Sequence, residues 1–383
     1  MALNNYKLGD LLMRNSEENK DLIYGISDVR GVRNTKGISN TKIDVSGRNL
    51  KTFLVVRPGG FIFNHRVHDK LGLGYNTSDE TYIFTNDYVS FYVKPEVKNR
   101  ILLPDYLYMW YLRPEFDRYM LFKTYGSATL FFSWDNMCEL EIELPDLPTQ
   151  QKYVDVYNAM VANQQAYERG LEDLKLTCDA YIEDLRKQIP PEKIGKYIEP
   201  EETTNADLQF SIADVRGVSI EKKFIETKAD MEGVSLAPYL LIQPNEFAYV
   251  PVTSRNGGKI SIALNDSDKT YICSSSYVVF RSRNIEKLLP QYLMLFFSRN
   301  EFNRYSRFHS WGSAREAFDW DAMCDVQIPI PDIEIQKSIA EMYTVYNKRK
   351  KINEQLKAQI KNICPILIRG SLEDGGEPNG EPA

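Results

Sequence analysis

The sequence contains an internal repeat, and this repeat limits the possible folds more than any other feature. Residues 26–32 (ISDVRGV) return 186 positions later as residues 212–218 (IADVRGV), with six of seven residues identical. At the same offset, residues 126–145 return as residues 312–331 with ten identities in twenty. Between these two blocks the offset changes to 189. A chain of 383 residues is also longer than one core usually organises, so we predict two domains of related fold.

Each half starts with strand patterns. Residues 82–93 and 271–280 are short segments rich in β-branched and aromatic residues and bounded by Asn, Asp and Ser, which is typical of strands. The halves differ most in residues 33–80 and 219–269. We therefore expect an α/β (α+β) fold, with two tandem mixed α/β domains separated by long helices. The expected boundaries are 1–145 for the first domain, 146–189 for the central helix, 190–330 for the second domain, 331–369 for the C-terminal helix and 370–383 for a disordered acidic tail.

A heptad pattern follows each half, because apolar residues recur there in steps of three and four. A helix from Tyr153 to Leu185 would be about 50 Å long at 1.5 Å per residue, too long for the surface of a compact domain. We expect the two long helices to pair as a coiled coil; the alternative is that each helix docks on its own domain. Arg349 and Asn353 interrupt the second pattern, and buried polar residues of this kind fix the register of a coiled coil. The expected seam consists of Tyr153, Tyr157, Met160, Tyr167, Leu171, Leu174, Tyr181 and Leu185 in the central helix, and of Ile339, Met342, Tyr346, Leu356, Ile360, Ile363 and Leu367 in the C-terminal helix.

Charge and cysteine content exclude several classes of protein. The chain carries 47 Lys and Arg against 53 Asp and Glu, so its net charge of -6 gives no overall attraction to nucleic acid or to an anionic membrane. The first residues lack the pattern of a signal peptide, and the most apolar stretch, residues 101–112, is broken by Pro104 and Asp105. The five cysteines lie far apart, which argues against a disulfide framework or a zinc site. We expect no membrane span and a location in the cytoplasm.

No catalytic or cofactor motif stands out in the sequence. A phosphate-binding Gly-x-x-x-x-Gly-Lys-Ser/Thr loop is missing, so ATP hydrolysis is not expected in this chain. His65 and His68 have the spacing of metal ligands, but their polar neighbours favour a solvated loop without a metal. Cys138 and Cys324 occupy equivalent repeat positions beside methionines, which is typical of core packing. We expect no catalytic residues, no metal and no cofactor in this chain.

Positive charge is concentrated in two segments. Residues 30–70 contain nine Lys and Arg against two acidic residues, a local charge of +7. Residues 299–315 contain four Arg against one Glu, a local charge of +3, and aromatic side chains and a histidine are interleaved with the arginines. Cations hold the phosphate backbone of DNA while polar and planar side chains contact base edges, so both segments favour a DNA-binding surface. The alternative is a solvated basic face without a ligand.

The order of these motifs resembles the specificity subunit of type I restriction-modification systems. Each half ends in a Gly-Ser-Ala, Trp-Asp and Met-Cys block, followed by a Pro-Asp-x-x-x-Gln turn at residues 145–150 and 331–336 and by a long heptad helix. The resemblance covers nearly the whole chain. It implies two target-recognition domains that each read one half of a split, asymmetric sequence in double-stranded DNA. It also implies that the two long helices pair as an antiparallel coiled coil and hold these domains apart. It also implies that this subunit is non-catalytic and has as partners two DNA methyltransferase subunits, which carry S-adenosylmethionine, and restriction (motor-nuclease) subunits, which carry ATP and Mg²⁺.

The resemblance places DNA contacts near the Gly-Ser blocks and in the variable segments. The expected contacts are Arg33, Lys36, Lys42, Arg48, Arg66, Lys70, Tyr125 and Ser127 in the first domain, and Arg255, Asn256, Lys259, His309, Trp311, Ser313 and Arg315 in the second. Arginine pairs with guanine and asparagine with adenine through two hydrogen bonds. We therefore expect base readout from four of these residues, Arg66, Arg255, Asn256 and Arg315. The equivalent residues Arg30 and Arg216 have two interpretations, an ion pair with the aspartate two positions before them or phosphate binding.

A second class of function remains open. Duplicated domains and a coiled coil are also typical of a non-enzymatic adaptor that binds protein partners, and the acidic balance favours that hypothesis slightly. A nuclease is poorly supported, because no Glu/Asp-x-Lys sequence follows the Pro-Asp pairs at a credible strand position. A steep salt dependence of DNA binding separates DNA recognition from the adaptor hypothesis.

Overall fold

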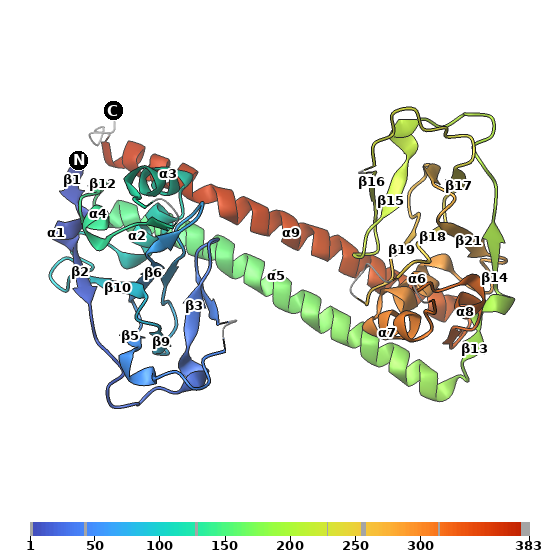
Figure 1. Ribbon diagram of the computed structural model, residues 1–383, viewed down its shortest axis with the longest axis horizontal. Helices are drawn as coiled ribbons and strands as arrows, with labels where there is room; N and C mark the ends of the chain where they lie inside the picture. The colour runs from blue at the N-terminus through green and yellow to red at the C-terminus, as the bar shows by residue number, and fades with distance from the viewer. Residues whose placement is uncertain are drawn as a thin grey trace, which may run out of the picture. The chain divides into compact units, whose positions relative to one another are not determined.

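The chain folds into two compact units. The structure is a computed structural model that describes residues 3–41, 44–126, 129–227, 229–253, 258–312 and 315–376 (Figure 1). Unit 1 consists of Met1–Tyr167 and Ile352–Ala383, and unit 2 of Glu168–Lys351. Each unit therefore combines one globular domain with part of both long helices, whereas the sequence suggested domains followed by separate helices.

Unit 1 is built around a four-stranded antiparallel sheet in the order β2-β10-β6-β8. The antiparallel pairs β1-β12, β3-β4, β5-β9 and β7-β11 accompany this sheet. Its strands are β1 (Asn4–Lys7), β2 (Leu12–Asn15), β3 (Arg30–Val32), β4 (Ile38–Asn40), β5 (Leu54–Val56), β6 (Phe61–Asn64), β7 (Arg66–Val67), β8 (Leu73–Tyr75), β9 (Tyr82–Phe84), β10 (Tyr88–Val93), β11 (Leu130–Phe131) and β12 (Glu141–Leu144). Its short helices are α1 (Leu8–Leu11), α2 (Pro104–Tyr111), α3 (Pro114–Lys123) and α4 (Trp134–Cys138), with 3-10 turns at Ile26–Asp28 and Leu50–Thr52.

Unit 2 repeats this plan with the sheet order β14-β21-β18-β19 and the antiparallel pairs β13-β22, β15-β16 and β17-β20. Its strands are β13 (Glu192–Lys193), β14 (Ile198–Glu201), β15 (Arg216–Val218), β16 (Phe224–Glu226), β17 (Leu240–Ile242), β18 (Phe247–Tyr249), β19 (Ile262–Leu264), β20 (Tyr271–Cys273), β21 (Val278–Ser282) and β22 (Gln327–Ile328). Its short helices are α6 (Pro290–Ser298), α7 (Asn300–Phe308) and α8 (Trp320–Cys324), with 3-10 turns at Ile194–Lys196 and Ile212–Asp214. Two mixed domains of strands and helices, as the sequence predicted, are thereby confirmed.

Aromatic stacking organises both cores at equivalent positions. In unit 1 the rings of Phe61 on β6 and Phe91 on β10 stack with centroids 5.1 Å apart. In unit 2 the rings of Phe247 on β18 and Phe280 on β21 stack at 4.8 Å. Each of these pairs is also a cross-strand pair, so the two sheets share one register. Large buried rings at the sheet centre contribute most of the apolar area of such a core.

The strand register also locates the change in repeat offset. In unit 1 nine residues, 64–72, separate the paired residues that close the β6-β8 hairpin. In unit 2 twelve residues, 250–261, separate the equivalent residues of β18 and β19. The three additional residues therefore lie in the second connection, which includes three of the predicted DNA contacts, Arg255, Asn256 and Lys259.

The central helix lies within its predicted segment, 146–189, whereas the C-terminal helix extends beyond its predicted end at residue 369. Helix α5 spans Leu147–Gln188 and has 42 residues, and α9 spans Ile333–Gly376 and has 44 residues. Within unit 1 the two helices lie side by side (Figure 1). Tyr153 donates a hydrogen bond to Asp374 at 2.9 Å, and the Gln164 amide donates to Asn353 at 3.0 Å in the buried seam. Because the partner number falls as the α5 number rises, the pair is antiparallel, as the family resemblance implied.

The C-terminal end of α9 corrects the prediction of a disordered tail from residue 370. Residues 370–376 are helical. Ser371 is fully buried and is hydrogen-bonded to the Tyr106 hydroxyl at 2.6 Å, and Asp374 pairs with Lys152 at 2.6 Å. Acidic composition indicated disorder, but these contacts with the domain order the segment.

The predicted seam is wrong at one position near the end of α5. Tyr181 is 40% exposed, and Ile182 is fully buried in its place. A straight helix has 3.6 residues per turn and drifts away from a 3.5-residue heptad, so the buried face moves by one position. Ile182 and Leu185 belong to the core of unit 2, which shows that the helix ends also dock on the domains. Of the other predicted seam residues most are half-buried, and four are buried, namely Leu171, Leu185, Ile339 and Leu367.

A buried glutamine joins each domain to the start of its long helix. Gln150 is fully buried, and its side chain donates to the carbonyls of Ile101 at 2.8 Å and Pro145 at 2.9 Å. Its carbonyl oxygen accepts the Leu103 amide at 3.0 Å. Gln336 in unit 2 makes the same three hydrogen bonds at 2.8 or 2.9 Å. We call these two side chains the glutamine latches; they explain the Pro-Asp-x-x-x-Gln motif.

The equivalent cysteines lie where a glycine approaches them closely. A Cβ atom at Gly9 would lie 2.9 Å from the Cβ of Cys138, and one at Gly195 would lie 2.7 Å from the Cβ of Cys324. Burial raises the pKa of both thiols, so they are neutral at physiological pH. Cys138 thus packs at the contact between α4 and α1, and Cys324 packs at the contact between α8 and the 3-10 turn at Ile194–Lys196.

The glutamine latch predicts a large loss of stability on substitution. Gln150→Leu keeps the side-chain volume but leaves three buried backbone groups without this partner. Each such group costs about 1–3 kcal/mol, so we expect the free energy of unfolding to fall by about 3 kcal/mol or more in urea denaturation. The control is Gln151→Leu, because Gln151 is exposed and contacts only Asp155 on the next turn. An equal decrease in the free energy of unfolding in the two variants would contradict the stabilising role of the Gln150 hydrogen bonds.

Candidate nucleic-acid interface

In unit 1 a group of exposed side chains forms beside the Gly-Ser block. Strand β7 pairs with β11 so that Arg66 lies opposite Phe131, and Tyr125 forms a bridge with Phe131 as well. The Arg66 side chain is 55% exposed and pairs with Asp87 at 3.6 Å. Tyr125 is 59% exposed, and the His65 ring stacks on Phe131 with centroids 5.4 Å apart. The strand pairing therefore places a cation beside several planar side chains on the surface.

A glycine with positive φ shapes the loop in both units. Gly126 has a φ of +113°, and a Cβ atom there would lie 2.1 Å from the Thr129 carbonyl oxygen. Gly312 has a φ of +138°, and a Cβ atom there would lie 2.3 Å from the Arg315 carbonyl oxygen. Only glycine fits such a position. The glycine of the repeated block thus turns the chain directly after the exposed aromatic residue.

Unit 2 presents different side chains on the same frame. Trp311 is 71% exposed and forms a bridge with Ala317, which also forms a bridge with Val252. Arg315 is exposed between the two ends of this turn. Val252 and Ala317 occupy positions that hold an arginine and a phenylalanine in unit 1. The backbone arrangement is therefore shared, and the exposed chemistry is not.

A second group of cations surrounds the turn after β3. The turn at residues 33–37 lies against β8 through a backbone hydrogen bond of 2.7 Å. Arg33 and Lys70 are exposed beside it. In unit 2 Lys259, the equivalent of Lys70, has a side chain that is 46% exposed and pairs with Glu221 at 3.6 Å. Exposed ion pairs of this kind are weak, so these cations can exchange their partner for a phosphate.

Lys36 was predicted to contact DNA, and the structure contradicts this. Its side chain is only 4% exposed; the ammonium donates to a backbone carbonyl at 2.7 Å and pairs with Asp117 at 2.6 Å. In unit 2 the equivalent Lys222 donates to the amide oxygen of Asn303 at 2.8 Å instead. Burial and, to a smaller degree, the charge of Lys259 lower the pKa of Lys222 to about 7. Charge composition could not reveal that these lysines anchor the turns from inside.

The remaining predicted contacts differ in their surroundings. Arg48 is exposed and follows Val45, which belongs to a small separate core cluster. His309 is half-buried, and its ring centroid lies 4.2 Å from that of Tyr305. Five predicted contacts lie outside the described residues, namely Lys42, Ser127, Arg255, Asn256 and Ser313.

The equivalent arginines after the 3-10 turns do not form the ion pairs considered from the sequence. The guanidinium of Arg30 lies 4.5 Å from the centroid of a tyrosine ring, and that of Arg216 lies 4.8 Å from another. Both donate to backbone carbonyls. Asp28 and Asp214 accept backbone amides at 2.8 Å and 2.9 Å. Cation-π contact and local hydrogen bonds therefore hold these arginines.

Two exposed phenylalanines were missed as candidate site residues. Phe122 on α3 is 83% exposed, and its repeat equivalent Phe308 on α7 is 73% exposed. They lie three residues before Tyr125 and Trp311, so each unit exposes two large rings next to its glycine turn. Large exposed apolar side chains that recur in this way mark a contact surface. A comparison of the two repeats would have shown that a phenylalanine recurs at this position. Helical periodicity would have placed it on the exposed face of the helix.

Metal and membrane sites are absent from the part of the chain that the structure describes. No group of three or more His, Cys, Asp or Glu side chains in these residues is arranged to hold a metal ion. Within the same residues, neither the long helices nor any shorter one has the apolar length needed to cross a bilayer.

Comparison with known proteins identifies the domain in unit 2. The family model of the type I restriction modification DNA specificity domain matches residues 221–362. Residues 221–362 therefore contain a domain of this family. The specificity subunit of the HindI type I restriction enzyme of Haemophilus influenzae is 24% identical over 135 residues, which is 35% of this chain. That match spans 29% of the length of the HindI subunit.

Solved structures of specificity subunits resemble the whole chain. The S subunit of a type I restriction-modification system from M. genitalium is 10% identical and aligns over 100% of this chain and 97% of that chain, with a TM-score of 0.52. The HsdS subunit from Thermoanaerobacter tengcongensis is 13% identical and aligns over 98% and 97%, with a TM-score of 0.38. At such low identity the likeness to the M. genitalium subunit concerns the fold alone.

The neutral partner of Lys222, the amide of Asn303, predicts that the stability of unit 2 depends on pH. The pKa of Lys222 is about 7 in the folded unit, against an ordinary value of 10.5. Between about pH 7 and 10 the unfolded chain therefore binds a proton that the folded chain does not, and the free energy of unfolding rises with pH over this range. We expect the stability of the wild type relative to Lys222→Met to increase from pH 7 to pH 9 in urea denaturation.

The two units provide the matched controls for this pH dependence. Asn303→Asp supplies the carboxylate that Asp117 provides in unit 1, so it should raise the pKa of Lys222 and flatten the slope. Burial already lowers the pKa of Lys36, and Asp117 opposes this shift, so Asp117→Asn should lower that pKa further and steepen the pH dependence. The same pH dependence in the wild type and in Lys222→Met would contradict the role of this buried ammonium.

We expect the exposed rings of Phe122 and Phe308 to contribute to DNA binding. Phe308→Ala and Phe122→Ala should each weaken DNA affinity about tenfold at fixed salt, because a phenylalanine side chain that becomes buried against a partner contributes about 1.5–3 kcal/mol. Fluorescence anisotropy with labelled duplex measures this, and the unfolding temperature should not change. Leu176→Ala is the control, since Leu176 is 70% exposed on α5. Unchanged affinity in both phenylalanine variants would assign the rings to another partner.

Proposed function

We propose that this chain is the DNA sequence-recognition subunit of a type I restriction-modification complex, in which each unit reads one half of a bipartite, asymmetric target. The observation that carries the proposal is the contrast within the repeat. The glutamine latches and the stacked sheets recur, whereas the exposed groups around Arg66 and Arg315 differ. One frame with two sets of exposed side chains suits two different half-sites. The match of residues 221–362 to a DNA specificity domain supports the same function.

The exposed cations divide into two roles under this proposal. Arg66 and Arg315 stand in the loops next to the glycine turns, where a guanidinium can pair with the O6 and N7 atoms of guanine. Arg33, Arg48, Lys70 and Lys259 contact phosphates, and they supply affinity that depends on salt rather than on sequence. The predicted contacts outside the described residues, Arg255 and Asn256 above all, stay in the proposal as base readers.

The proposal extends to partners. The subunit binds double-stranded DNA and positions two DNA methyltransferase subunits, which carry S-adenosylmethionine, and restriction subunits, which carry ATP and Mg²⁺. It has no catalytic role of its own, and it acts in the cytoplasm together with these partners. The alternative function is an adaptor that binds only proteins.

Sequencing of the methylated bases in the host tests the function. Deletion of this chain should remove one split, asymmetric adenine-methylated motif from the genome and leave other methylated motifs in place. Complementation with the wild-type chain should restore that motif. An unchanged pattern of methylation after deletion would favour the adaptor.

Arg315→Ala should relax the sequence preference in one half-site only. A bidentate contact between arginine and guanine discriminates by about 1–3 kcal/mol, so variants of that half-site should be methylated at rates closer to that of the target. The other half-site should be read as before, because Arg315 has a threonine, Thr129, at its repeat equivalent. Lys259→Ala is the control and should weaken binding to all sequences equally while reducing the salt slope by about one. An equal loss on all sequences in Arg315→Ala would assign it to a phosphate.

A further inference from the structure

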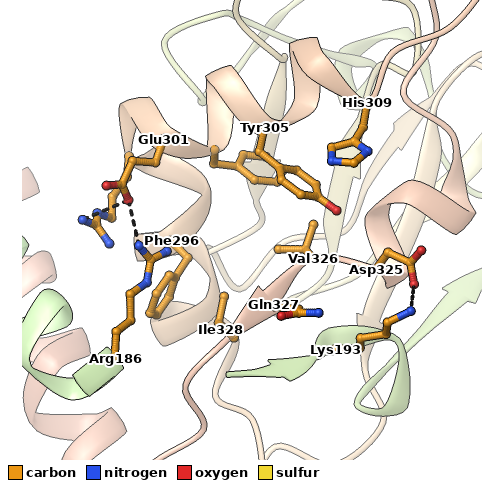
Figure 2. Close-up of a pocket in the computed structure, with 12 residues that line it drawn as sticks. Arg186, Lys193, Phe296, Glu301, Tyr305, His309, Asp325, Val326, Gln327 and Ile328 are labelled. Atoms are coloured by element: carbon orange, nitrogen blue, oxygen red, sulfur yellow. Dashed lines mark hydrogen bonds and ion pairs between the residues drawn. The ribbon is translucent and has the colours of Figure 1, made fainter. Parts of the chain in front are cut away.

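Each unit contains a cleft at the same place in the repeat. In unit 2 a cleft of about 650 Å³ lies between α7 and β22, as Figure 2 shows. In unit 1 a cleft of about 610 Å³ is lined by residues of α3 and β12. Each of the ten residues that line the unit 1 cleft has its equivalent, 186 positions later, in the lining of the unit 2 cleft. The clefts are therefore two copies of one site.

Between the two repeats, the residues that line the clefts are much more similar than the segments that include most of the predicted DNA contacts. Five of the ten positions are identical, and the other five keep their character, for example Trp110 and Phe296. The identical positions are, in unit 2, Lys193, Arg299, Glu301, Phe302 and Tyr305. Segments 33–80 and 219–269, which include most of the predicted DNA contacts, share little. Unlike the segments that include most of the predicted DNA contacts, the clefts are therefore chemically alike in the two units.

Arg299, which lines the cleft of unit 2, has a hydrogen-bond donor that the described residues leave unused. Its side chain is 10% exposed and pairs with Asp179 at 3.2 Å, Glu183 at 2.7 Å and Glu301 at 3.0 Å. Its Nη1 atom is nevertheless buried without a hydrogen-bond partner among the described residues. A buried N–H group that lacks an acceptor costs about 1–3 kcal/mol. This atom therefore marks a position for an oxygen atom of a ligand.

The equivalent Arg113 in unit 1 also has donors to spare. Its Nε atom donates to the Trp110 carbonyl at 3.1 Å, and its guanidinium lies 4.3 Å from the centroid of the Trp110 ring. Within the described ranges no ion pair includes Arg113. Both clefts thus contain a largely buried guanidinium that can donate to an incoming acceptor.

The middle of the unit 2 cleft is apolar. Figure 2 shows the ion pair of Arg186 with Glu301 and that of Lys193 with Asp325 at opposite ends, with distances of 3.3 Å and 2.6 Å. Aromatic and aliphatic side chains lie between these two pairs, among them Phe296, Tyr305 and Val326. An apolar side chain of a partner fits between the two ion pairs.

We propose that each cleft receives the same short peptide segment of a methyltransferase subunit, which inserts an apolar side chain and offers a carbonyl oxygen to the buried arginine. This inference rests on the function proposed above. The acceptor is a neutral carbonyl, because three carboxylates already surround Arg299. DNA fits less well, since Lys193 and Arg186 are paired within the cleft and leave little positive charge for phosphates. Two equal clefts then hold two copies of one partner while the two reading surfaces differ.

Filling one cleft at a time tests the proposal. Gln327 on β22 and its equivalent Glu141 on β12 are exposed on the walls of the clefts. The full-length chain is mixed with its methyltransferase subunit, and native mass spectrometry counts the bound copies. The wild type should bind two copies, Gln327→Trp and Glu141→Trp one copy each, and the double variant none. Each lost copy should correspond to an affinity at least tenfold weaker.

Controls separate the cleft from folding and from DNA binding. Ile285→Trp adds the same ring at a position that is 58% exposed and outside both clefts, and it should retain two copies. The unfolding temperature of each variant checks folding, and the two single variants test the two clefts independently. Two copies in every variant would overturn the proposal, and so would a loss of DNA affinity with both copies retained. A wild type that binds no methyltransferase would overturn the proposed function itself, and the clefts with it.

Discussion

The buried glutamine at the start of each long helix is the interaction on which the rest of the structure depends. Gln150 and Gln336 satisfy backbone groups from two segments that would otherwise be buried without partners, so the end of each domain and the start of each helix form one unit. The core of unit 1 also includes the last turns of α9, and the core of unit 2 includes the last turns of α5. Each core therefore contains the start of one long helix and the end of the other, which fixes the antiparallel direction of the pair without help from the heptads.

The sequence predicted features that recur, and it failed where a contact lies between residues far apart. The strand-rich halves and the Pro-Asp-x-x-x-Gln motif could be predicted because each occurs in both repeats of the sequence. Lys36 looked like a DNA contact because composition registers charge and not burial, and its partner Asp117 lies on a helix far along the chain. Tyr181 looked like a seam residue because a heptad ignores the slower drift of a real helix. The clefts could not be seen at all, since their linings come from several separate segments of each unit.

Within the repeat, preservation and divergence fall on different surfaces. The glycine turns keep their backbone in both units, but the side chains that project from the paired segments change from arginine and phenylalanine to valine and alanine. The three additional residues of unit 2 lie in the same region. The clefts keep their chemistry instead. Under the proposed function, a chain that reads two different sequences while it holds two equal partners needs this separation of surfaces.

The anchored lysines show that the repeat conserves geometry more strictly than charge. Lys36 and Lys222 both adopt a positive φ, +64° and +60°, which is uncommon for a lysine and is held here by an ammonium buried inside the unit. In unit 1 a carboxylate balances that ammonium, and in unit 2 a neutral amide accepts from it at nearly the same place. An ammonium that can lose its proton does not need a counter-ion to remain buried, so the turn keeps its shape after the charge is gone. The hairpins that carry the cations proposed to contact phosphates are therefore held in the same way in both units, although their electrostatic environments differ.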